Sequence, residues 1–426
     1  MSGDPEQPHR RRHRAHGVAA LRKLVAATAV SSLGDGLVAV ALPLLALRLT
    51  KSALLIAALS AATQLPWLVV GLPAGVLIDR VNRRRLVVLV ETGRAVVVAV
   101  VAVLAALRRS SLPELYVAAV LIGVGDTLVY AASRSVVPRA SAGQTMVRAA
   151  GRLTAAQSAT LTFAGPALGG WLFSVARSIP FVADALSYVA SAGLLRGAVS
   201  DAERTDGGAA RARTEERESA RGELRGGLGW FAGSRALKAL VSCVASLAFC
   251  QAVVFGVLVV YATRQLHLDA TGYGLFLALA AMGNVAGSLG AAKLHSVLGP
   301  YLTIVTAGCL AASGYLALGS TSDRVVAVVA LGIEAVAVAI GNVASTAARY
   351  RIIPAERFGV VSNAFRMFVV GATPLGSLCG GALAVAYGTR TTFAVAGALQ
   401  LVALVAVAVP LRSIRVTEPP EPALNP

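Results

Sequence analysis

The stretch "GLPAGVLIDRVNRRRLVVLV", residues 71–90, joins two long apolar runs through a short charged turn. One acid and four arginines fall within seven residues of it: Asp79, Arg80, Arg83, Arg84 and Arg85. The apolar run on each side has the length of about 20 residues that a membrane-spanning helix requires. Basic residues collect in the short loops at the cytoplasmic surface of membrane proteins. The stretch therefore predicts two membrane helices joined by a turn at the membrane surface.

The rest of the chain repeats this pattern. Its 426 residues are 56% hydrophobic and only 14% charged, and its mean hydropathy is +0.71. Soluble domains carry about 25% charged residues, so the composition excludes an ordinary soluble protein. We predict an all-α integral membrane protein with twelve transmembrane helices, at residues 24–47, 53–78, 86–107, 113–133, 153–175, 179–197, 238–263, 272–294, 301–319, 325–347, 364–387 and 391–410.

The formal charge of +18 reflects the topology of the chain. Twelve spans place both termini on one side of the membrane, and roughly three quarters of the 39 Lys and Arg residues fall on that side, as the positive-inside rule describes. We therefore expect a multi-pass protein of the inner (plasma) membrane with both termini in the cytoplasm. The charge does not predict binding to nucleic acid.

A long polar segment divides the chain into two halves. We predict a basic cytoplasmic tail (1–23), a six-helix bundle (24–197), a cytoplasmic linker (198–237), a second six-helix bundle (238–410) and a cytoplasmic C-terminal tail (411–426). The halves resemble each other: "ASRSVVPRASAGQTMVRAAGRL" precedes the fifth span and "AARYRIIPAERFGVVSNAFRM" precedes the eleventh. Internal repeats of this kind are typical of secondary transporters.

The sequence carries no sign of enzymatic chemistry. The four cysteines all fall within predicted spans, without a second cysteine or histidine at metal-ligand spacing. No zinc-protease, hydrolase, phosphate-loop or dinucleotide motif stands in a suitable context. We expect no enzyme activity, no metal and no cofactor.

The turn at residues 79–85 carries a family resemblance. The pattern Gly75-x-x-x-Asp79-Arg80-x-x-Arg83-Arg84 is similar to the cytoplasmic signature of the major facilitator superfamily, with Asn82 where glycine is usual. The resemblance covers nearly the whole chain. It implies two pseudo-symmetric six-helix bundles that open alternately to the two sides of the membrane.

The same resemblance implies a role for the acid in the turn. Asp79 does not contribute to an excess of positive charge, whereas at a helix N-terminus an anion is stabilised by about 0.3–1 kcal/mol. In the resembled family this N-terminus belongs to span eleven, and the contact closes the cytoplasmic side, with Arg80, Arg83 and Arg84 adding ion pairs. The alternative is a simple turn whose arginines only set the topology.

A second motif lies in the fifth span. Gly165, Pro166, Gly169 and Gly170 resemble the antiporter motif of proton-driven exporters, although such clusters also serve plain helix packing. The stretches "SSLGDGLVAVALPLLALRLT", "ADALSYVAS" and "PLGSLCGGAL" are similar to the macrolide-efflux and enterobactin-export branch. One position departs from the superfamily pattern: span four has Ala119 where an arginine is usual, so the proton-linked role of that arginine is not carried over.

Four polar residues lie near the middle of predicted spans: Asp35, Asp126, Glu334 and Gln251. A charge at the bilayer centre costs roughly 2.5–3.5 kcal/mol, so such residues are functional candidates. The resemblance implies that their spans line the central cavity. We expect Asp35 and Asp126 to carry a coupling proton, and Glu334 and Gln251 to help recognise the substrate, although these roles could be exchanged. The alternative is that each acid is a hydrogen-bond partner between helices.

Three further charges look structural. Glu91 and Arg94 are three residues apart in span three and are suited to pairing with each other or with the basic turn. Asp184 is expected near the outer end of span six, close enough to the lipid headgroups to remain hydrated.

The composition and the repeated halves predict a transporter, and the family resemblance with its Gly-Pro motif implies a proton-coupled exporter of a small organic compound such as a drug, a siderophore or a secondary metabolite. Its partners would be that compound, protons and the lipid bilayer, and it would work as a monomer. An importer or proton symporter is the alternative among transporters, and a polytopic membrane enzyme or an assembly protein is the alternative of another class. The residues leave the identity of the substrate open.

Overall fold

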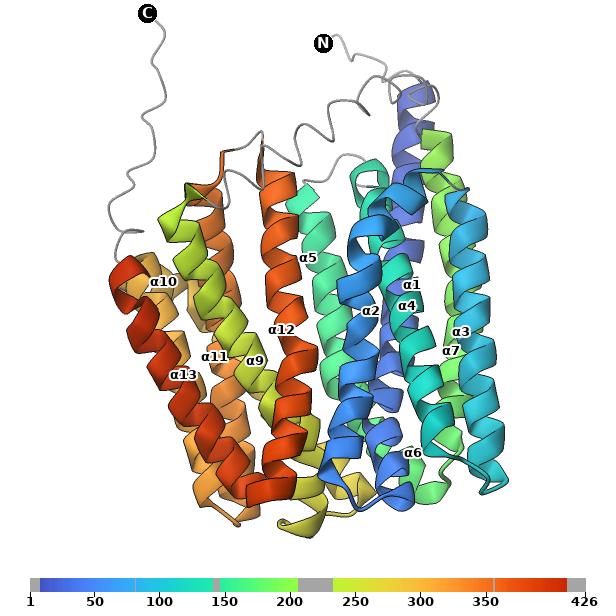
Figure 1. Cartoon of the computed structure of the whole chain (residues 1–426). Coiled ribbons are helices and arrows are strands. Elements are labelled where there is room, and N and C mark those ends of the chain that lie inside the picture. Colours follow the sequence, from blue (N-terminus) through green and yellow to red (C-terminus); the bar gives the residue numbers. More distant parts are fainter. Residues whose placement is uncertain (1–7, 81, 141–145, 206–232, 355–356, 412–426) are drawn as a thin grey trace, which may run out of the picture. The chain divides into compact units, whose positions relative to one another are not determined.

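The computed structural model describes residues 8–80, 82–140, 146–205, 233–354 and 357–411. Within these ranges the chain forms helices and no strands. Figure 1 shows the course of the chain. The first half contains α1 (Pro8–Leu49), α2 (Ala53–Arg80), α3 (Arg83–Ala106), α4 (Leu112–Ala140), α5 (Met146–Gln157), the π-helix η1 (Ser158–Ala164), α6 (Gly165–Val175) and α7 (Ile179–Thr205). The second half contains α9 (Arg235–Arg264), α10 (Ala270–Ser320), α11 (Arg324–Ile352), α12 (Phe358–Tyr387) and α13 (Thr389–Leu411).

These helices confirm the twelve predicted spans. In the described ranges, nine helices are long and apolar enough to cross a membrane, and α10 is one of them. Helix α10 contains two spans, because Gly299 adopts a φ of 71° immediately before Pro300. Helices α5, η1 and α6 form one continuous span, since the residues at both junctions have helical torsion angles. Helix α7 matches the predicted sixth span.

Helix ends follow local sequence signals. The side chain of Asn82 accepts a hydrogen bond from the backbone of Arg85 at the start of α3, and Ser234 and Asp323 cap α9 and α11 in the same way. Such caps satisfy backbone N–H groups that the first turn of a helix leaves unpaired. Gly388, with a φ of 82°, separates α12 from α13 because glycine tolerates this left-handed conformation.

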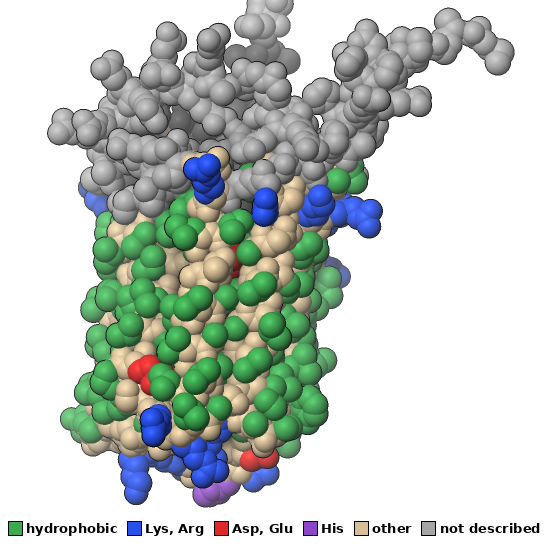
Figure 2. All heavy atoms as spheres, turned by 90° about the vertical axis from the view of Figure 1, so that its right-hand side faces the viewer, with side chains coloured by type: hydrophobic (Ala, Val, Ile, Leu, Met, Phe, Trp, Pro, Cys, Tyr) green, Lys and Arg blue, Asp and Glu red, His purple; other side chains and the backbone are tan. Residues whose placement is uncertain are grey.

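Large apolar side chains cover the outside of the helices. Leu89, Leu289 and Val405 are among the most exposed residues, whereas Tyr188 and Tyr315 are fully buried. On the face shown in Figure 2, hydrophobic side chains form a broad band, and Lys and Arg side chains gather beyond it. An apolar outer surface of this extent fits the hydrocarbon region of a bilayer.

The chain divides into two compact units. Unit 1 comprises Met1–Lys51, Ala62–Ala212 and Leu268–Ala278, and unit 2 comprises Ser52–Ala61, Arg213–His267 and Leu279–Pro426. Within unit 1, α7 packs extensively against α1 and α3, and α3 also packs against α4. Within unit 2, α9 packs against α12 and α13. The helices of unit 1 that contact one another in this way carry the polar residues described next.

Candidate functional site

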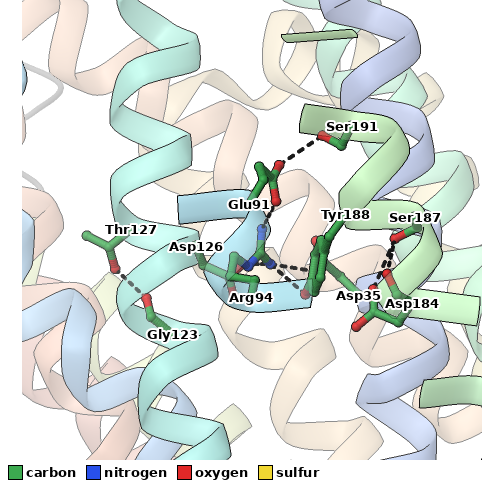
Figure 3. Close-up of polar contacts among 10 residues, drawn as sticks. All are labelled: Asp35, Glu91, Arg94, Gly123, Asp126, Thr127, Asp184, Ser187, Tyr188 and Ser191. Atoms are coloured by element: carbon green, nitrogen blue, oxygen red, sulfur yellow. Dashed lines mark hydrogen bonds and ion pairs between the residues drawn. The ribbon is translucent and has the colours of Figure 1, made fainter. Parts of the chain in front are cut away.

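A buried arginine on α3 lies at the centre of a polar cluster in unit 1. The guanidinium of Arg94 donates from Nη1 to Glu91 Oε2 at 3.2 Å and from Nη2 to Asp35 Oδ1 at 2.8 Å. It also forms an ion pair with Asp126. Figure 3 shows the Arg94 side chain between these carboxylates and Tyr188. We call these five residues the Arg94 cluster.

Helix α7 completes the cluster with hydroxyl groups. The Tyr188 hydroxyl accepts from Arg94 Nη2 and donates to Asp35 Oδ1, each at 2.7 Å. The Arg94 guanidinium also lies over the Tyr188 ring, 3.9 Å from its centroid. Ser191 donates to Glu91 Oε1 at 2.8 Å. The cluster therefore links four helices, α1, α3, α4 and α7, through one cation.

Local sequence features determine where these side chains lie and leave space for Arg94. One face of α7 carries four polar residues at positions i, i+3, i+4 and i+7, a spacing that places them on the same side of a helix. They are Asp184, Ser187, Tyr188 and Ser191. Gly125 on α4 faces the aliphatic part of Arg94, and a Cβ at this position would meet Arg94 Cγ at 2.6 Å. The absence of a side chain at Gly125 therefore lets Arg94 pass alongside α4 to reach Asp126.

The Arg94 cluster contains more acids than bases. Three carboxyl groups contact one guanidinium, and desolvating an ion costs several kcal/mol unless an opposite charge compensates it. Arg94 itself is buried, whereas the side chains of Asp35 and Asp126 keep 25% and 35% of their surface exposed. The cluster is thus suited to hold protons on its partly exposed acids.

Unit 2 contains a smaller polar group, which we call the Glu334 cluster: Glu334, Gln251 and Tyr315. Gln251 on α9 donates to Glu334 Oε1 at 2.8 Å, and the Tyr315 hydroxyl on α10 contacts the same oxygen at 3.3 Å. Glu334 on α11 is only 2% exposed. In the described part of the chain its hydrogen-bond partners are these two neutral side chains.

The structure thus groups the four predicted site residues into two pairs. Asp35 and Asp126 both contact Arg94 within unit 1. Gln251 and Glu334 contact each other directly within unit 2. The contacts agree with hydrogen bonding between helices, which was the alternative for every acid, and the roles in proton binding and substrate recognition stay predictions.

The glycines of the fifth span lie at close helix contacts. A Cβ on Gly36 of α1 would meet Gly165 Cα and the carbonyl oxygen of Leu161, each at 2.8 Å. Gly169 packs in the same way against the backbone of Leu37, and Gly170 against Gly274. Pro166 lies directly after η1 inside this continuous span, where it has no N–H to donate to the preceding turn. The motif therefore brings α6 against α1 next to Asp35.

The π-helix η1 lies directly before this motif. Its carbonyl oxygens at Thr160 and Leu161 face Gly36. Single π-helical turns within α-helices are frequent at functional sites. The backbone next to Asp35 is thus irregular on the side of η1.

The cytoplasmic signature is described only in its backbone. Helix α2 ends at Arg80 and α3 begins at Arg83, which confirms a short turn. The side chains of Asp79, Arg80, Arg83 and Arg84 and the surroundings of Gly75 lie outside the described part of the chain. The gating contact of Asp79 with span eleven therefore stays a prediction.

Sequence reasoning missed the central residue of the cluster. Arg94 was expected to be structural, but it contacts both candidate proton carriers. The expectation for Asp184 was wrong, because the structure buries this side chain completely instead of leaving it hydrated. A signal was present in both cases: Arg94 is a charge within a span, and Asp184 shares a polar helix face with Tyr188.

The position of Arg94 is also relevant to span four, where the sequence departs from the superfamily pattern. Ala119, which stands where the superfamily has arginine, is buried and apolar. The cation that contacts the acid of α4 comes from α3 instead. The structure therefore places a membrane-embedded arginine beside Asp126 from a different helix.

A sequence profile described as transmembrane secretion effector, within the major facilitator superfamily, matches residues 16–422. The chain belongs to this family. No curated protein matches it in sequence.

Several solved structures share the fold of this chain. A bacterial homologue of the human lysosomal transporter Spinster, inward-facing and unoccupied, superposes with a TM-score of 0.70 at 14% identity, covering 99% of this chain and 100% of that one. A bacterial homologue of the iron transporter ferroportin, inward-facing, gives 0.70 at 18% identity, covering 93% and 98%. The nucleoside transporter NupG gives 0.63 at 12% identity, covering 95% and 100%.

These findings identify a multi-pass membrane transporter of the major facilitator fold. The family and the structural neighbours are transporters, which argues against an enzyme. At identities of 11–18% the structural likeness establishes the fold alone.

Proposed function

We propose that this protein exports a small organic compound from the cytoplasm in exchange for protons. The observation that carries the proposal is the Arg94 cluster, in which three carboxyl groups share one buried guanidinium. The description of the family as a secretion effector supports export. The antiporter-like glycines next to Asp35 support the exchange with protons.

Charge balance explains how the cluster would bind a proton. With Asp35, Glu91 and Asp126 all ionised, the cluster would carry a net negative charge in the membrane interior, where uncompensated charges are costly. Protonation of Asp35 or Asp126 removes one surplus charge and leaves Arg94 paired with the others. In this proposal protons reach Asp35 and Asp126 from water through the exposed part of each side chain, 25% and 35% of its surface.

The same contacts would link proton binding to motion. Asp35 belongs to α1, Asp126 to α4 and Arg94 to α3, so each change of protonation alters an attraction between helices. A proton moved through about 100 mV supplies about 2.3 kcal/mol, which corresponds to a substrate gradient of roughly fifty-fold. In this proposal Glu334 and Gln251 contribute to substrate recognition, and Asp79 with its neighbouring arginines closes the cytoplasmic side.

The proposal also includes the location, oligomeric state and partners of the transporter. The transporter would lie in the plasma membrane with both termini in the cytoplasm, as the distribution of Lys and Arg indicates. It would act as a monomer, with protons, its substrate and lipid as its partners.

Vesicles of both orientations test the proposal. Everted membrane vesicles that contain the protein should accumulate a transported probe when respiration is started, and a protonophore should abolish this uptake. Ethidium and radiolabelled erythromycin are suitable first probes, since one is cationic and the other is a macrolide. Respiration-driven uptake in right-side-out vesicles instead would show an importer.

The Asp126→Asn variant tests the role of the cluster in the same assay. Asparagine keeps the shape of the side chain but removes both its charge and its exchangeable proton. We expect loss of respiration-driven uptake in this variant and normal uptake in Asp323→Asn, which changes an exposed helix cap to another good capping residue. Unchanged uptake in Asp126→Asn would remove Asp126 from the mechanism.

A further inference from the structure

A fourth acid lies beside the Arg94 cluster, and no ion pair joins it to a cation in the described part of the chain. Asp184 on α7 is completely buried. Its Oδ1 atom lies 3.1 Å from the Ser187 hydroxyl, and its Oδ2 atom has no hydrogen-bond partner in the described part of the chain. Figure 3 shows Asp184 and Ser187 on α7 next to Asp35 on α1.

Ser187 cannot fully satisfy the Asp184 carboxyl group. Its hydroxyl carries a single proton, and its shorter contact, 2.8 Å, is with the backbone carbonyl oxygen of Asp184. The same hydroxyl also donates to Oδ1 at 3.1 Å, so its one proton is shared between two acceptors. An ionised Asp184 would therefore receive only part of one hydrogen bond on Oδ1 and none on Oδ2 within the described part of the chain.

The charges around Asp184 also favour its neutral form. The charged side chains close enough to interact with it electrostatically are Asp35 on α1, Arg94 on α3 and Asp126 on α4. The Nη atoms of Arg94 are already engaged by the other members of the Arg94 cluster, and only its Nε atom is buried without a partner. Helix α6, which also packs against α7, contains no titratable side chain. An ionised Asp184 would therefore be a buried anion beside other anions.

A glycine places this acid next to Asp35. A Cβ on Gly34 would lie only 3.0 Å from the carboxyl carbon of Asp184, and it would also collide with the Ser187 hydroxyl. The Asp184 carboxyl group therefore rests on the bare backbone of α1 at the residue that directly precedes Asp35. Asp35 is partly exposed, whereas Asp184 is sealed.

We propose that Asp184 binds a second exchangeable proton of the transport cycle, which it receives from and returns to Asp35. In the transfer, the O–H bond of the Asp184 carboxyl group breaks and an O–H bond forms on the Asp35 carboxylate. Asp35 then becomes neutral and loses its ion pair with Arg94, while Asp184 takes the negative charge. This inference rests on the proposed proton coupling, because it assigns an additional residue to the same route.

Infrared spectroscopy of the full-length protein in liposomes tests the protonation directly. A protonated carboxyl group has a carbonyl stretching band that is separate from the bands of carboxylates and amides. At pH 7 we expect Asp184→Asn to lose the intensity of one such band, and Asp323→Asn, the exposed control, to lose none. Ser187→Ala keeps the acid but removes its hydrogen-bond partner, so it should shift the band. An unchanged band in both Asp184→Asn and Ser187→Ala would overturn the proposal.

Transport in everted vesicles tests the exchange. We expect Asp184→Asn to lose respiration-driven accumulation of the probe found for the wild type while it elutes as a folded protein. If the band disappears in Asp184→Asn but driven accumulation is unchanged, Asp184 is a permanently neutral structural acid and the proposal is wrong. If a sodium gradient rather than a proton gradient drives the wild type, the proposed function fails, whereas the infrared band still reports whether Asp184 is protonated.

Discussion

The Arg94 cluster and the Glu334 cluster bury acids in two different ways. In unit 1, three carboxyl groups from three helices contact a single guanidinium, and two of the acids are partly exposed. In unit 2, one carboxyl group is sealed among an amide and a phenol, with no cation among its partners in the described chain. The first arrangement depends on charge, whereas the second depends on neutral hydrogen bonds.

This difference indicates in which unit protonation can alter the contacts between helices. A proton on Asp35 or Asp126 changes the number of ion pairs between α1, α3 and α4. A proton on Glu334 leaves both of its hydrogen-bonded neighbours in place, because a carboxyl group accepts in either state. We therefore expect the substitutions below to have larger effects in unit 1 than at the matching positions of unit 2.

Removal of the cation should have the largest effect. Arg94→Met preserves the length of the side chain but leaves Asp35, Glu91 and Asp126 without their counter-ion, and breaking a buried ion pair costs about 3–5 kcal/mol. We expect a large fall in the thermal unfolding midpoint of the purified protein in detergent. The unfolding midpoint of Arg94→Lys should lie between those of the wild type and Arg94→Met, because lysine keeps the charge without the planar guanidinium fork. A midpoint equal to the wild type in Arg94→Met would contradict the central role of charge.

Two buried tyrosines offer a matched comparison of the clusters. The hydroxyl of Tyr188 bonds two charged groups, and its loss in Tyr188→Phe should lower the free energy of unfolding by about 1.5–3 kcal/mol. Tyr315→Phe removes a longer contact with Glu334, and about 0.5–1.5 kcal/mol is expected. Equilibrium unfolding of both variants in the same detergent gives the two values. A larger loss in Tyr315→Phe would reverse our comparison of the two units.

Two glycine-to-alanine substitutions test whether Gly125 leaves the space that Arg94 requires. Gly125→Ala adds a methyl group against the Arg94 side chain, and overpacking of this kind costs typically 1–3 kcal/mol. Gly93→Ala is the control, since a Cβ there meets nothing within 4 Å, and it should be neutral or stabilising by up to about 1 kcal/mol. Both changes are read from the unfolding midpoint. Equal effects at the two positions would show that Gly125 has no role in placing Arg94.

The smallest effect is expected at Glu334. Glu334→Gln keeps an acceptor for Gln251 and Tyr315, so the free energy of unfolding should change by less than about 1 kcal/mol. Asp126→Asn, the matched substitution in unit 1, removes an ion pair with Arg94 and should destabilise more. A marked stabilisation by Glu334→Gln would show that Glu334 is ionised in the folded protein, because a buried charge without a counter-ion would have been removed.

The positions of the spans could be read directly from the chain. Twelve apolar runs, short turns such as 79–85, and glycine or proline at the breaks fixed the helices to within a few residues at most ends. The largest differences lie where polar residues continue a helix beyond its apolar span, as at the start of α1. Polar residues at a helix end lower the hydropathy, but the helix itself continues. Gly299 was recognisable as a boundary, since glycine followed by proline favours a break.

The cluster partners could not be read in the same way. Asp35 and Tyr188 are 153 residues apart, and Arg94 and Asp35 are 59 apart. Spacing along one helix shows which residues share its face, as for Asp184 and Tyr188, but not which neighbouring helix that face meets. The sequence therefore predicted that Glu91 and Arg94 pair with each other or with the basic turn, and that Asp184 lies near water.

The sequence by itself determined that this protein crosses the membrane, where its helices run and which of them hold acids, because the cost of placing polar groups in lipid acts on each segment separately. Only the tertiary structure decided that three acids share Arg94 and that Glu334 contacts an amide and a phenol among the described residues. The rotation and contact of helices are set by packing at residues such as Gly34 and Gly125. Charge balance is a property of the assembled cluster, and no single helix contains it.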